Sequence, residues 1–316
     1  MKVLGIDLGG TNVSMGVVDD SGKIIARLTI ETRVIEGFAS VVKRISEASL
    51  KLIESTGGVD GIGIGSPGSI EHKRGVVRFS PNFPDWIDVP LAPELEKRLG
   101  IKVVLENDAN AFVVGEKWFG KGKGYTDIIG ITLGTGVGGG VISNGQLLRG
   151  STGIAAELGH IVVDPDGYLC GCGNHGCLET IASATGISRL AKEWKERYPK
   201  SDLRDFSAKS VMSAARDGDA LGLKVLDRVS NALGIAIGNL IHIFNPQLIV
   251  IGGGVSRAGE VLLSAVKKRT RENVMRSFWG TYKIVLSDLV DDAGIYGAAS
   301  TGFEEISSPS SKENDA

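Results

Sequence analysis

Residues 6–19 read IDLGGTNVSMGVVD, and residues 131–143 read ITLGTGVGGGVIS. In each stretch an apolar strand leads into a Gly/Thr turn and then into a second strand, which ends at another turn. Asp7 and Thr132 begin the two loops, a little under half the chain apart. A strand–loop–strand unit used twice at this spacing predicts two related lobes, each presenting a glycine loop to one ligand. A chance similarity of two Gly-rich hairpins is the alternative.

The rest of the chain alternates between strand and helix patterns. Runs of Val, Ile and Leu predict strands at residues 2–7, 13–18, 24–30, 60–65, 102–105, 127–133, 138–142, 247–251 and 283–286. Apolar residues at helical spacing predict helices at residues 36–54, 91–99, 109–119, 178–196, 208–216, 219–243 and 257–275. This alternation predicts an α/β fold with parallel strands, and with hairpins at the first and middle glycine clusters.

Composition bears on the partners of the protein and on where it works. The 316 residues carry a formal charge of −2, which gives no reason to expect nucleic acid as a partner. No apolar stretch reaches 18 residues and the start, MKVLGIDLGG, lacks a signal-peptide pattern, so we expect no membrane span. All three cysteines lie between positions 170 and 177, which favours a reducing cytoplasm over a disulfide scaffold.

Glycine is unusually abundant, with 45 residues gathered mainly after apolar runs. Residues 63–68 and 134–139 match G-x-G-x-x-G by letter, but both continue into turns and strands. A dinucleotide fingerprint needs a helix directly after the loop, and no Walker A sequence occurs, so the Rossmann interpretation is weak.

The two hairpin loops can hold phosphate by another route. Backbone N–H groups and two hydroxyls would face phosphate oxygens from both loops, at Gly9, Gly10, Thr11, Gly134, Thr135 and Gly136. Asp7 would repel phosphate unless a cation lay between them, so it fits as an inner- or outer-shell partner of Mg²⁺. Alternatively, Asp7 caps a turn and the glycines only tighten hairpins.

Several motifs occur together and in order: DLGGT at 7–11, ENDAN at 106–110, LGTGVGGG at 133–140, ELGH at 157–160, CGCGNHGCLE at 170–179 and IGGGV at 251–255. Together they closely resemble the ROK family (repressors, open reading frames and sugar kinases), over nearly the whole chain. The resemblance implies an actin-like fold with an ATP cleft between two ribonuclease-H-like lobes. We expect a small lobe of residues 1–113 with a C-terminal helix returning in 294–316, and a large lobe of residues 114–293 that carries the zinc loop and the nucleotide site.

The cysteine cluster predicts a metal site. His160, Cys170, Cys172 and Cys177 form a tetrahedral zinc set of the Cys₃His type, and four protein ligands make such a zinc structural. Free buried thiols are the alternative. His175 is a rival nitrogen ligand that spacing alone does not exclude, and the resemblance favours His160.

Phosphoryl transfer needs a carboxylate that accepts the proton of the attacking hydroxyl. Asp108 follows an apolar strand and precedes a helix, at the strand end where α/β proteins bind ligands. A residue at this place is also a good N-cap, and Asn107 could cap the helix while Asp108 points into the cleft. The resemblance implies that Asp108 is the catalytic base.

The resemblance also implies the remaining ligand contacts. The expected sugar-binding residues are Gly68, Asn82, Asn107, Asp108, Glu157, His160 and Glu179. Gly252, Gly253 and Gly254 resemble the nucleotide motif of the family, where absent side chains leave room for adenosine; a tight strand-to-helix turn is the alternative. Trp86 either stacks on a sugar face or belongs to the core.

The implied activity is transfer of the ATP γ-phosphate to the 6-hydroxyl of glucose, because SPNFPDW and ENDAN resemble the family's glucokinases. Fructose, mannose and N-acetylhexosamines stay open as substrates, as does a sugar-sensing regulator without its DNA-binding domain. DLGGT begins at residue 7, which leaves no room for an N-terminal helix-turn-helix. The expected partners are a hexose and further copies of the chain, as a dimer or tetramer.

Overall fold

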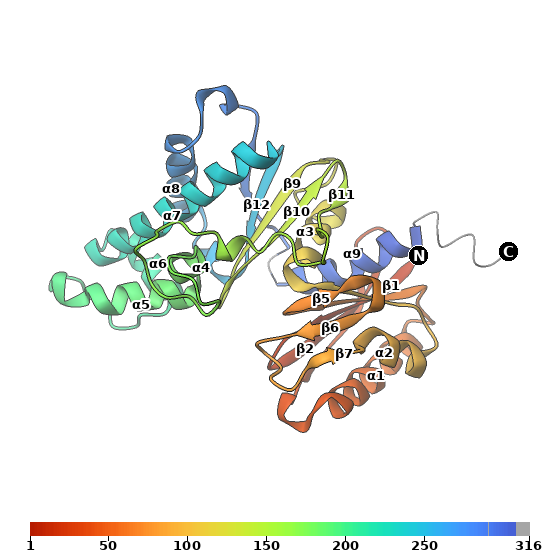
Figure 1. Cartoon of the computed structure of the whole chain (residues 1–316). Coiled ribbons are helices and arrows are strands. Elements are labelled where there is room, and N and C mark those ends of the chain that lie inside the picture. Colours follow the sequence, from red (N-terminus) through yellow and green to blue (C-terminus); the bar gives the residue numbers. More distant parts are fainter. Residues whose placement is uncertain (290, 308–316) are drawn as a thin grey trace. The chain divides into compact units, whose positions relative to one another are not determined.

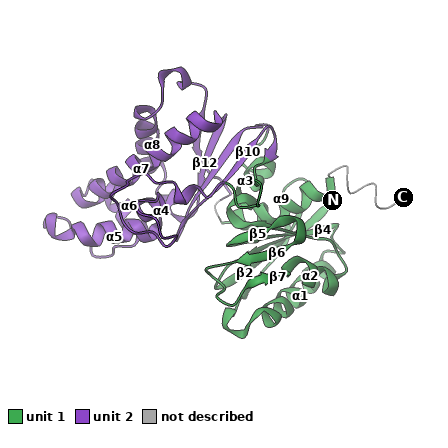
Figure 2. Cartoon of the chain, viewed as in Figure 1, with its two compact units in different colours: residues 1–123, 147–155, 291–316 green, residues 124–146, 156–290 purple. Residues whose placement is uncertain are grey.

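The computed structural model describes residues 1–289 and 291–307, which form two compact units (Figure 2). Unit 1 comprises residues 1–123, 147–155 and the described part of 291–316; unit 2 comprises residues 124–146 and the described part of 156–290. The predicted lobe limits remain a prediction, and residue 113 lies inside a helix. Among the described residues, no helix is both long and apolar enough to cross a membrane.

Unit 1, in which Figure 1 labels β1 and β2, is built on a five-stranded sheet of order β3-β2-β1-β4-β8. Its strands are β1 (Lys2–Leu8), β2 (Asn12–Asp19), β3 (Ile24–Glu31), β4 (Gly61–Ser66) and β8 (Val103–Asn107). The first three strands pair antiparallel, whereas β4 lies parallel to both β1 and β8. The predicted strands in this part of the chain are confirmed.

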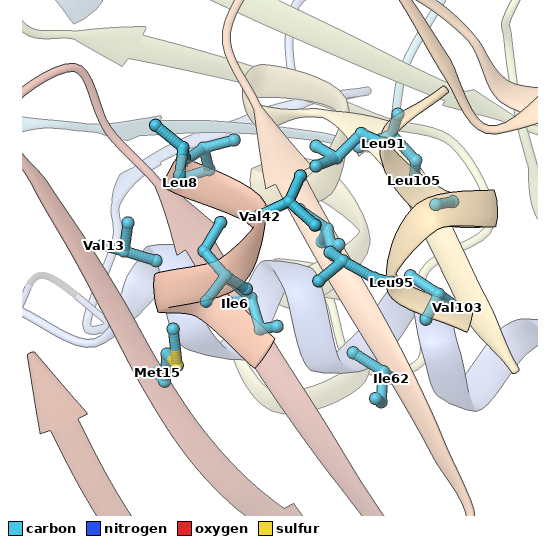
Figure 3. Packing of buried hydrophobic residues seen from close by; sticks show 14 of the residues in the cluster. Ile6, Leu8, Val13, Met15, Val42, Ile62, Leu91, Leu95, Val103 and Leu105 are labelled. Atoms are coloured by element: carbon cyan, nitrogen blue, oxygen red, sulfur yellow. The ribbon is translucent and has the colours of Figure 1, made fainter. Parts of the chain in front are cut away.

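Helices cover both faces of this sheet. Its helices are α1 (Phe38–Ser55), α2 (Leu91–Leu99), α3 (Asp108–Phe119) and α9 (Ala293–Ser307). Side chains alternate along β1, so Leu4 and Ile6 join the core beneath α1 and α2 (Figure 3), whereas Val3 packs with α9. Helix α9 belongs to unit 1, in the part of the chain where a returning C-terminal helix was predicted for 294–316; residues 308–316 lie outside the described part of the chain.

Glycine in the strands lets α9 lie directly on the sheet. A Cβ at Gly5 would lie 2.3 Å from the Ile295 carbonyl oxygen, and one at Gly63 would lie 1.8 Å from that of Ala298. No side chain fits at either position. Part of the unusual glycine content therefore serves packing between strand and helix.

A second, three-stranded sheet belongs to unit 1, with strands β5 (Ser69–Glu71), β6 (Val76–Phe79) and β7 (Ile87–Val89) in that order. The sequence predicts turns and strands after the second glycine cluster, but not their bounds. Trp86 lies beside β7 but is 1% exposed, with its ring stacked on Phe83 at 4.4 Å. It is therefore a core residue.

Unit 2 repeats the same arrangement of strands, in the order β11-β10-β9-β12-β13. They are β9 (Ile128–Leu133), β10 (Val137–Ser143), β11 (Gln146–Leu147), β12 (Leu248–Gly252) and β13 (Lys283–Leu286). β9 pairs antiparallel with β10 and parallel with β12, which is parallel to β13. Two sheets of one order confirm the prediction of two related lobes.

The helices of unit 2 agree with the periodicity, with two differences. They are α4 (Glu179–Ala182), α5 (Ala184–Trp194), α6 (Ala208–Arg216), α7 (Ala220–Phe244) and α8 (Glu260–Glu272). The helix predicted at 178–196 is two helices, because Ser183 is extended and caps α5 by accepting the Gly186 N–H at 3.0 Å. The helix predicted from 257 begins at Glu260, after a 3₁₀ turn at Gly254–Ala258.

Candidate functional site

The parallel strands of unit 1 bring two carboxylates to one edge of the sheet. Asp7 near the end of β1 is paired with Gly65 of β4, and the next residue of β4 is paired with Asn107 of β8. Asp108 follows directly. Because adjacent strands lie about 4.8 Å apart, the two aspartates are about 10 Å from each other across the sheet.

Asn107, not Asp108, caps helix α3. Its side-chain oxygen accepts the N–H groups of Ala109 at 2.9 Å and Asn110 at 3.1 Å, and its amide donates to the Gly68 carbonyl at 3.1 Å. Asp108 is exposed to solvent, with one carboxylate oxygen 2.9 Å from the Ala109 nitrogen. Asn107 caps the helix, as expected, so the Asp108 carboxylate is not needed for capping and remains accessible.

Both aspartates hold protons more tightly than usual. Burial, with a smaller contribution from the charge of Asp108, raises the pKa of Asp7 from 3.8 to about 6. Asp108 keeps an exposed surface, but the protein atoms packed around it partly desolvate the carboxylate and raise its pKa, which the Ala109 N–H only partly opposes. A cation beside Asp7 would relieve this cost, which fits the expected Mg²⁺ partner.

Other predicted residues of unit 1 lie against this edge. Gly68 has φ +107°, and a Cβ there would lie 2.2 Å from the Phe79 carbonyl oxygen, so the chain needs glycine at this turn. Gly10 lies beside Asn82: a Cβ placed on Gly10 would lie 3.4 Å from the Cβ of Asn82. One end of unit 1 therefore collects the expected phosphate loop and expected sugar contacts.

A backbone hydrogen bond from the first glycine closes each hairpin loop, over three residues in the first loop and two in the second. The Gly9 N–H donates to the Asn12 carbonyl at 3.0 Å, and the Gly134 N–H donates to the Gly136 carbonyl at 2.9 Å. Thr11 and Thr135, at the tips, are exposed. Each unit thus presents a hydroxyl and backbone amides on a tight turn, as a phosphate loop requires.

In unit 2, the three expected nucleotide glycines follow β12. Gly253 has φ +82° and comes so close to β9 that a Cβ would lie 2.5 Å from the Leu133 carbonyl oxygen. Gly254 begins a 3₁₀ turn and borders a cavity of about 340 Å³, together with Ala208, Met212 and Val255. The tight strand-to-helix turn is therefore present, and the contact of these glycines with adenosine remains a prediction.

A second cavity of unit 2 adjoins the Thr135 loop. It has a volume of about 680 Å³ and is bordered by Thr135, Thr185, Arg189, Lys192 and Ala208, among others. Ala208 borders both cavities. Cationic and hydroxyl side chains next to a glycine loop suit a phosphorylated ligand.

The cysteine cluster has the dimensions of a zinc site. The ligand atoms of His160, Cys170, Cys172 and Cys177 all lie within 4.8 Å of one another. The Cys172 and Cys177 sulfurs are 3.6 Å apart, as are the Cys170 sulfur and the His160 Nδ1. Tetrahedral zinc with ordinary bond lengths separates two sulfurs by about 3.8 Å, and a sulfur and a nitrogen by about 3.6 Å. These residues therefore fit the ion.

His175 lies outside this cluster. Its Nδ1 donates to the Gly167 carbonyl at 3.1 Å, and the residue is exposed. His160 turns Nδ1 toward the sulfurs, which leaves Nε2 as the ring nitrogen that can meet a hydroxyl. The sequence alone does not decide which histidine is the nitrogen ligand of the cluster; the structure favours His160.

Glu179 links the Cys₃His cluster to the Gly134–Gly136 loop of unit 2. One carboxylate oxygen accepts the Val137 N–H at 3.0 Å, and the other lies 3.8 Å from the Cys170 sulfur. A Cβ at Gly136 would lie 2.4 Å from this carboxylate, so the loop passes close to it. Glu157 precedes the 3₁₀ helix Leu158–His160. Their sugar contacts remain predictions.

The sequence interpretation missed a buried ion pair beneath Asp108. Glu106 is 1% exposed, and its carboxylate accepts the Arg149 Nε–H at 2.8 Å. A carboxylate at the end of an apolar strand was the available signal. Arg149 had none, because its partner lies 43 residues away.

Comparison with known proteins agrees with this geometry. The profile of the ROK family matches residues 3–302. A glucokinase of Thermotoga maritima is 51% identical and covers 97% of this chain and 98% of its own length; one of Halalkalibacterium halodurans is 40% identical, with 93% and 92% covered. The crystal structure of a ROK family glucokinase from Streptomyces griseus in complex with glucose and AMPPNP has a TM-score of 0.82 and 37% identity, covering 96% of this chain and all of that one.

Proposed function

The chain belongs to the ROK family, and from this premise we propose that it transfers the γ-phosphate of ATP to the 6-hydroxyl of glucose. Its fold is the actin-like α/β fold of the family's sugar kinases. The observation that carries the proposal is Asp108, an accessible carboxylate with a raised pKa at the carboxyl end of β8. The 51% identical relative is a glucokinase, which supports glucose as the substrate.

In this mechanism Asp108 acts as the general base. Its ionised carboxylate accepts the proton of the 6-hydroxyl while that oxygen bonds to the γ-phosphorus, and the bond from phosphorus to the β,γ-bridging oxygen breaks to release ADP. A raised pKa suits this role, because it makes the carboxylate a stronger base toward the hydroxyl proton. Asn107 keeps Asp108 at the first position of α3.

The phosphates would be held by the hairpin loops. Backbone amides and hydroxyls at Gly9–Thr11 and Gly134–Gly136 would bind the phosphate oxygens, and Gly252–Gly254 would border the adenosine. Asp7 would hold Mg²⁺, directly or through water; when bound, the ion neutralises the charge on the phosphates.

Zinc in the Cys₃His cluster would be structural. Four protein ligands leave no position for a substrate, so its role is to fix the segment that carries Glu157, His160 and Glu179. With Gly68, Asn82 and Asn107 these residues would read the sugar hydroxyls. Zinc thiolates and ATP consumption fit a cytoplasmic enzyme, and we expect a dimer or tetramer, which light scattering will test.

A coupled assay of ADP release, with ATP and Mg²⁺ over a panel of hexoses, tests the proposal. We expect glucose to have a kcat/KM at least about 10-fold above those of fructose, mannose and N-acetylglucosamine, a difference of about 1.4 kcal/mol in transition-state binding. No turnover with any hexose would leave a sugar-binding regulator. A preference for another hexose would overturn the choice of glucose alone.

A further inference from the structure

Glu106, the carboxylate of the ion pair with Arg149, makes hydrogen bonds to the chain on both sides of Asp108. Glu106 Oε1 accepts the backbone N–H of Asn107 at 3.0 Å and the side-chain amide of Asn110 at 3.1 Å. Asn107 comes immediately before Asp108, and Asn110 belongs to the first turn of α3. A single buried carboxylate thus bonds to the residue before Asp108 and to the turn that follows it.

Burial of this carboxylate requires compensation. The Glu106 side chain is 2% exposed, and Arg149 supplies the charge-assisted bond to Oε2 at 2.8 Å. His72 lies near the same oxygen, with Nδ1 at 3.3 Å, and donates this nitrogen's hydrogen to the Leu105 carbonyl at 2.8 Å. The guanidinium therefore carries most of the compensation.

Arg149 comes from an unusual part of the chain. Residues 147–155 belong to unit 1, although the chain on either side of them belongs to unit 2. The segment is folded back on itself, because Ala155 N–H donates to the Arg149 carbonyl at 3.1 Å. Gly153, with φ +86°, lies against β5, where a Cβ would be 3.0 Å from the Ile70 carbonyl oxygen. These contacts present the guanidinium to Glu106.

We propose that Glu106 and Arg149 form a positioning pair for Asp108: Glu106 fixes the backbone before it and the helical turn after it, and Arg149 cancels the charge that Glu106 would otherwise place beside the base. The proposal rests on the proposed function, in which Asp108 is the base. Of the titratable groups, Asp7 interacts electrostatically with Asp108, Glu106 bonds to the residue before it, and Arg149 and His72 lie against Glu106. Neither partner of the pair needs to touch the substrate.

Opposite changes of charge within the pair give opposite shifts, which a merely structural role would not. In Arg149→Met the unpaired Glu106 carboxylate favours neutral Asp108, so the acid limb of kcat/KM moves up by about 1 pH unit and kcat falls at least about 10-fold. In Glu106→Gln the unpaired guanidinium favours ionised Asp108, so the acid limb moves down. Glucose KM should stay within about 3-fold in both, because binding precedes proton transfer.

The double variant Glu106→Gln/Arg149→Met removes both charges and should return the acid limb to within about 0.3 unit of the wild type. The matched control is Arg78→Met. It removes a guanidinium 2.7 Å from Asp88, in an exposed pair of the same unit, and should move neither kcat nor the pH profile. Melting temperatures of all four variants report folding separately.

A lowered melting temperature with the acid limb unmoved in both single variants would reduce the pair to a structural ion pair. If Arg149→Met does not fold, the direction of the shift in Glu106→Gln decides. Failure of the proposed function is distinct: it appears as wild-type kcat in Asp108→Asn. Loss of activity in Asp108→Asn, with unmoved pH profiles in the pair variants, overturns only this inference.

Discussion

The two units share one sheet order but carry different chemistry at corresponding places. Asp7 of β1 pairs with Ser14 and Gly65; Thr132 of β9 stands at the corresponding place, paired with Gly138 and Gly252. The first position thus has a carboxylate and the second a neutral hydroxyl. Both hairpins present a glycine loop, so the repeated scaffold supplies the loops, and we propose that the carboxylate of Asp7 decides which of them attracts a cation.

The units also differ in how they hold their polar side chains. In unit 1, Asp7 and Asp108 sit at the ends of strands, and hydrogen bonds from neighbouring elements fix their surroundings. In unit 2, Glu157 and His160 lie between β11 and α4, where the regular structure is one short 3₁₀ helix and isolated bridges. A segment of this kind needs a cross-link, and the Cys₃His cluster supplies the ligands for one.

The largest expected effect concerns the residues just beyond the last strand of each sheet, which is β8 in unit 1 and β13 in unit 2. Asp108→Asn should lower kcat at least about 10²-fold and change glucose affinity less than about 10-fold, because the amide keeps the shape but cannot accept the proton. Asp288 is an exposed aspartate just beyond β13, with Ser287 between it and the end of the strand. Asp288→Asn is therefore the matched control, with kcat within about 3-fold of the wild type. Equal losses of kcat and affinity in Asp108→Asn would make it a binding or capping residue.

The sequence predicts those features of the fold and the site that depend on neighbouring residues, and it misses those that depend on distant ones. The strands, the repeated hairpins and the N-cap at Asn107 followed from local patterns, because alternation, glycine turns and caps are properties of neighbouring residues. Arg149 did not, because its role depends on a bond to Glu106 in another part of the chain. The bounds of the short strands β5–β7 were missed for another reason: three or four residues give too little pattern.

The second effect tests the cross-link of unit 2. Removal of zinc by a chelator, or Cys172→Ser, should lower glucose affinity about 10–100-fold, because the segment that carries Glu157 and His160 loses its fixed shape. Metal analysis and calorimetric titration with glucose measure the two quantities. His175→Ala is the matched control, because His175 lies in the same loop but bonds to the Gly167 carbonyl. A stable, fully active, zinc-free protein would contradict a structural zinc.

A third comparison concerns one left-handed residue in each unit. Gly68 has φ +107° with no space for a Cβ, so Gly68→Ala should destabilise the protein by about 1–3 kcal/mol. Ala156, next to Glu157, has φ +65° and already carries its methyl group. Ala156→Gly relieves strain and loosens the unfolded chain, so its stability should rise by at most about 1 kcal/mol. Urea unfolding measures the change in the free energy of unfolding for both variants. Changes of similar size, in opposite directions, would mean that φ alone, and not the space for a Cβ, sets the cost.

The smallest effect returns to Asp7 and Thr132 and depends on pH. Because the pKa of Asp7 is raised from 3.8 to about 6, the folded protein holds this proton where the unfolded chain has lost it. The free energy of unfolding contributed by Asp7 therefore falls as pH rises from about 4 to about 6, and stays low above that. The full shift corresponds to about 3 kcal/mol, and partial exposure reduces the expected cost to about 1–2 kcal/mol.

Asp7→Asn removes this cost. Without nucleotide or Mg²⁺, it should stabilise the protein by about 1–2 kcal/mol at pH 7.5 and by little at pH 4, while lowering kcat through loss of the metal partner. Thr132→Val, at the corresponding position of unit 2, removes no titrating group and should shift stability equally at both pH values. Addition of Mg²⁺ and an ATP analogue should stabilise the wild type more than Asp7→Asn, because the cation relieves the buried charge only where a carboxylate is present. Equal stabilisation of both proteins by the metal–nucleotide complex would remove Asp7 from the metal site.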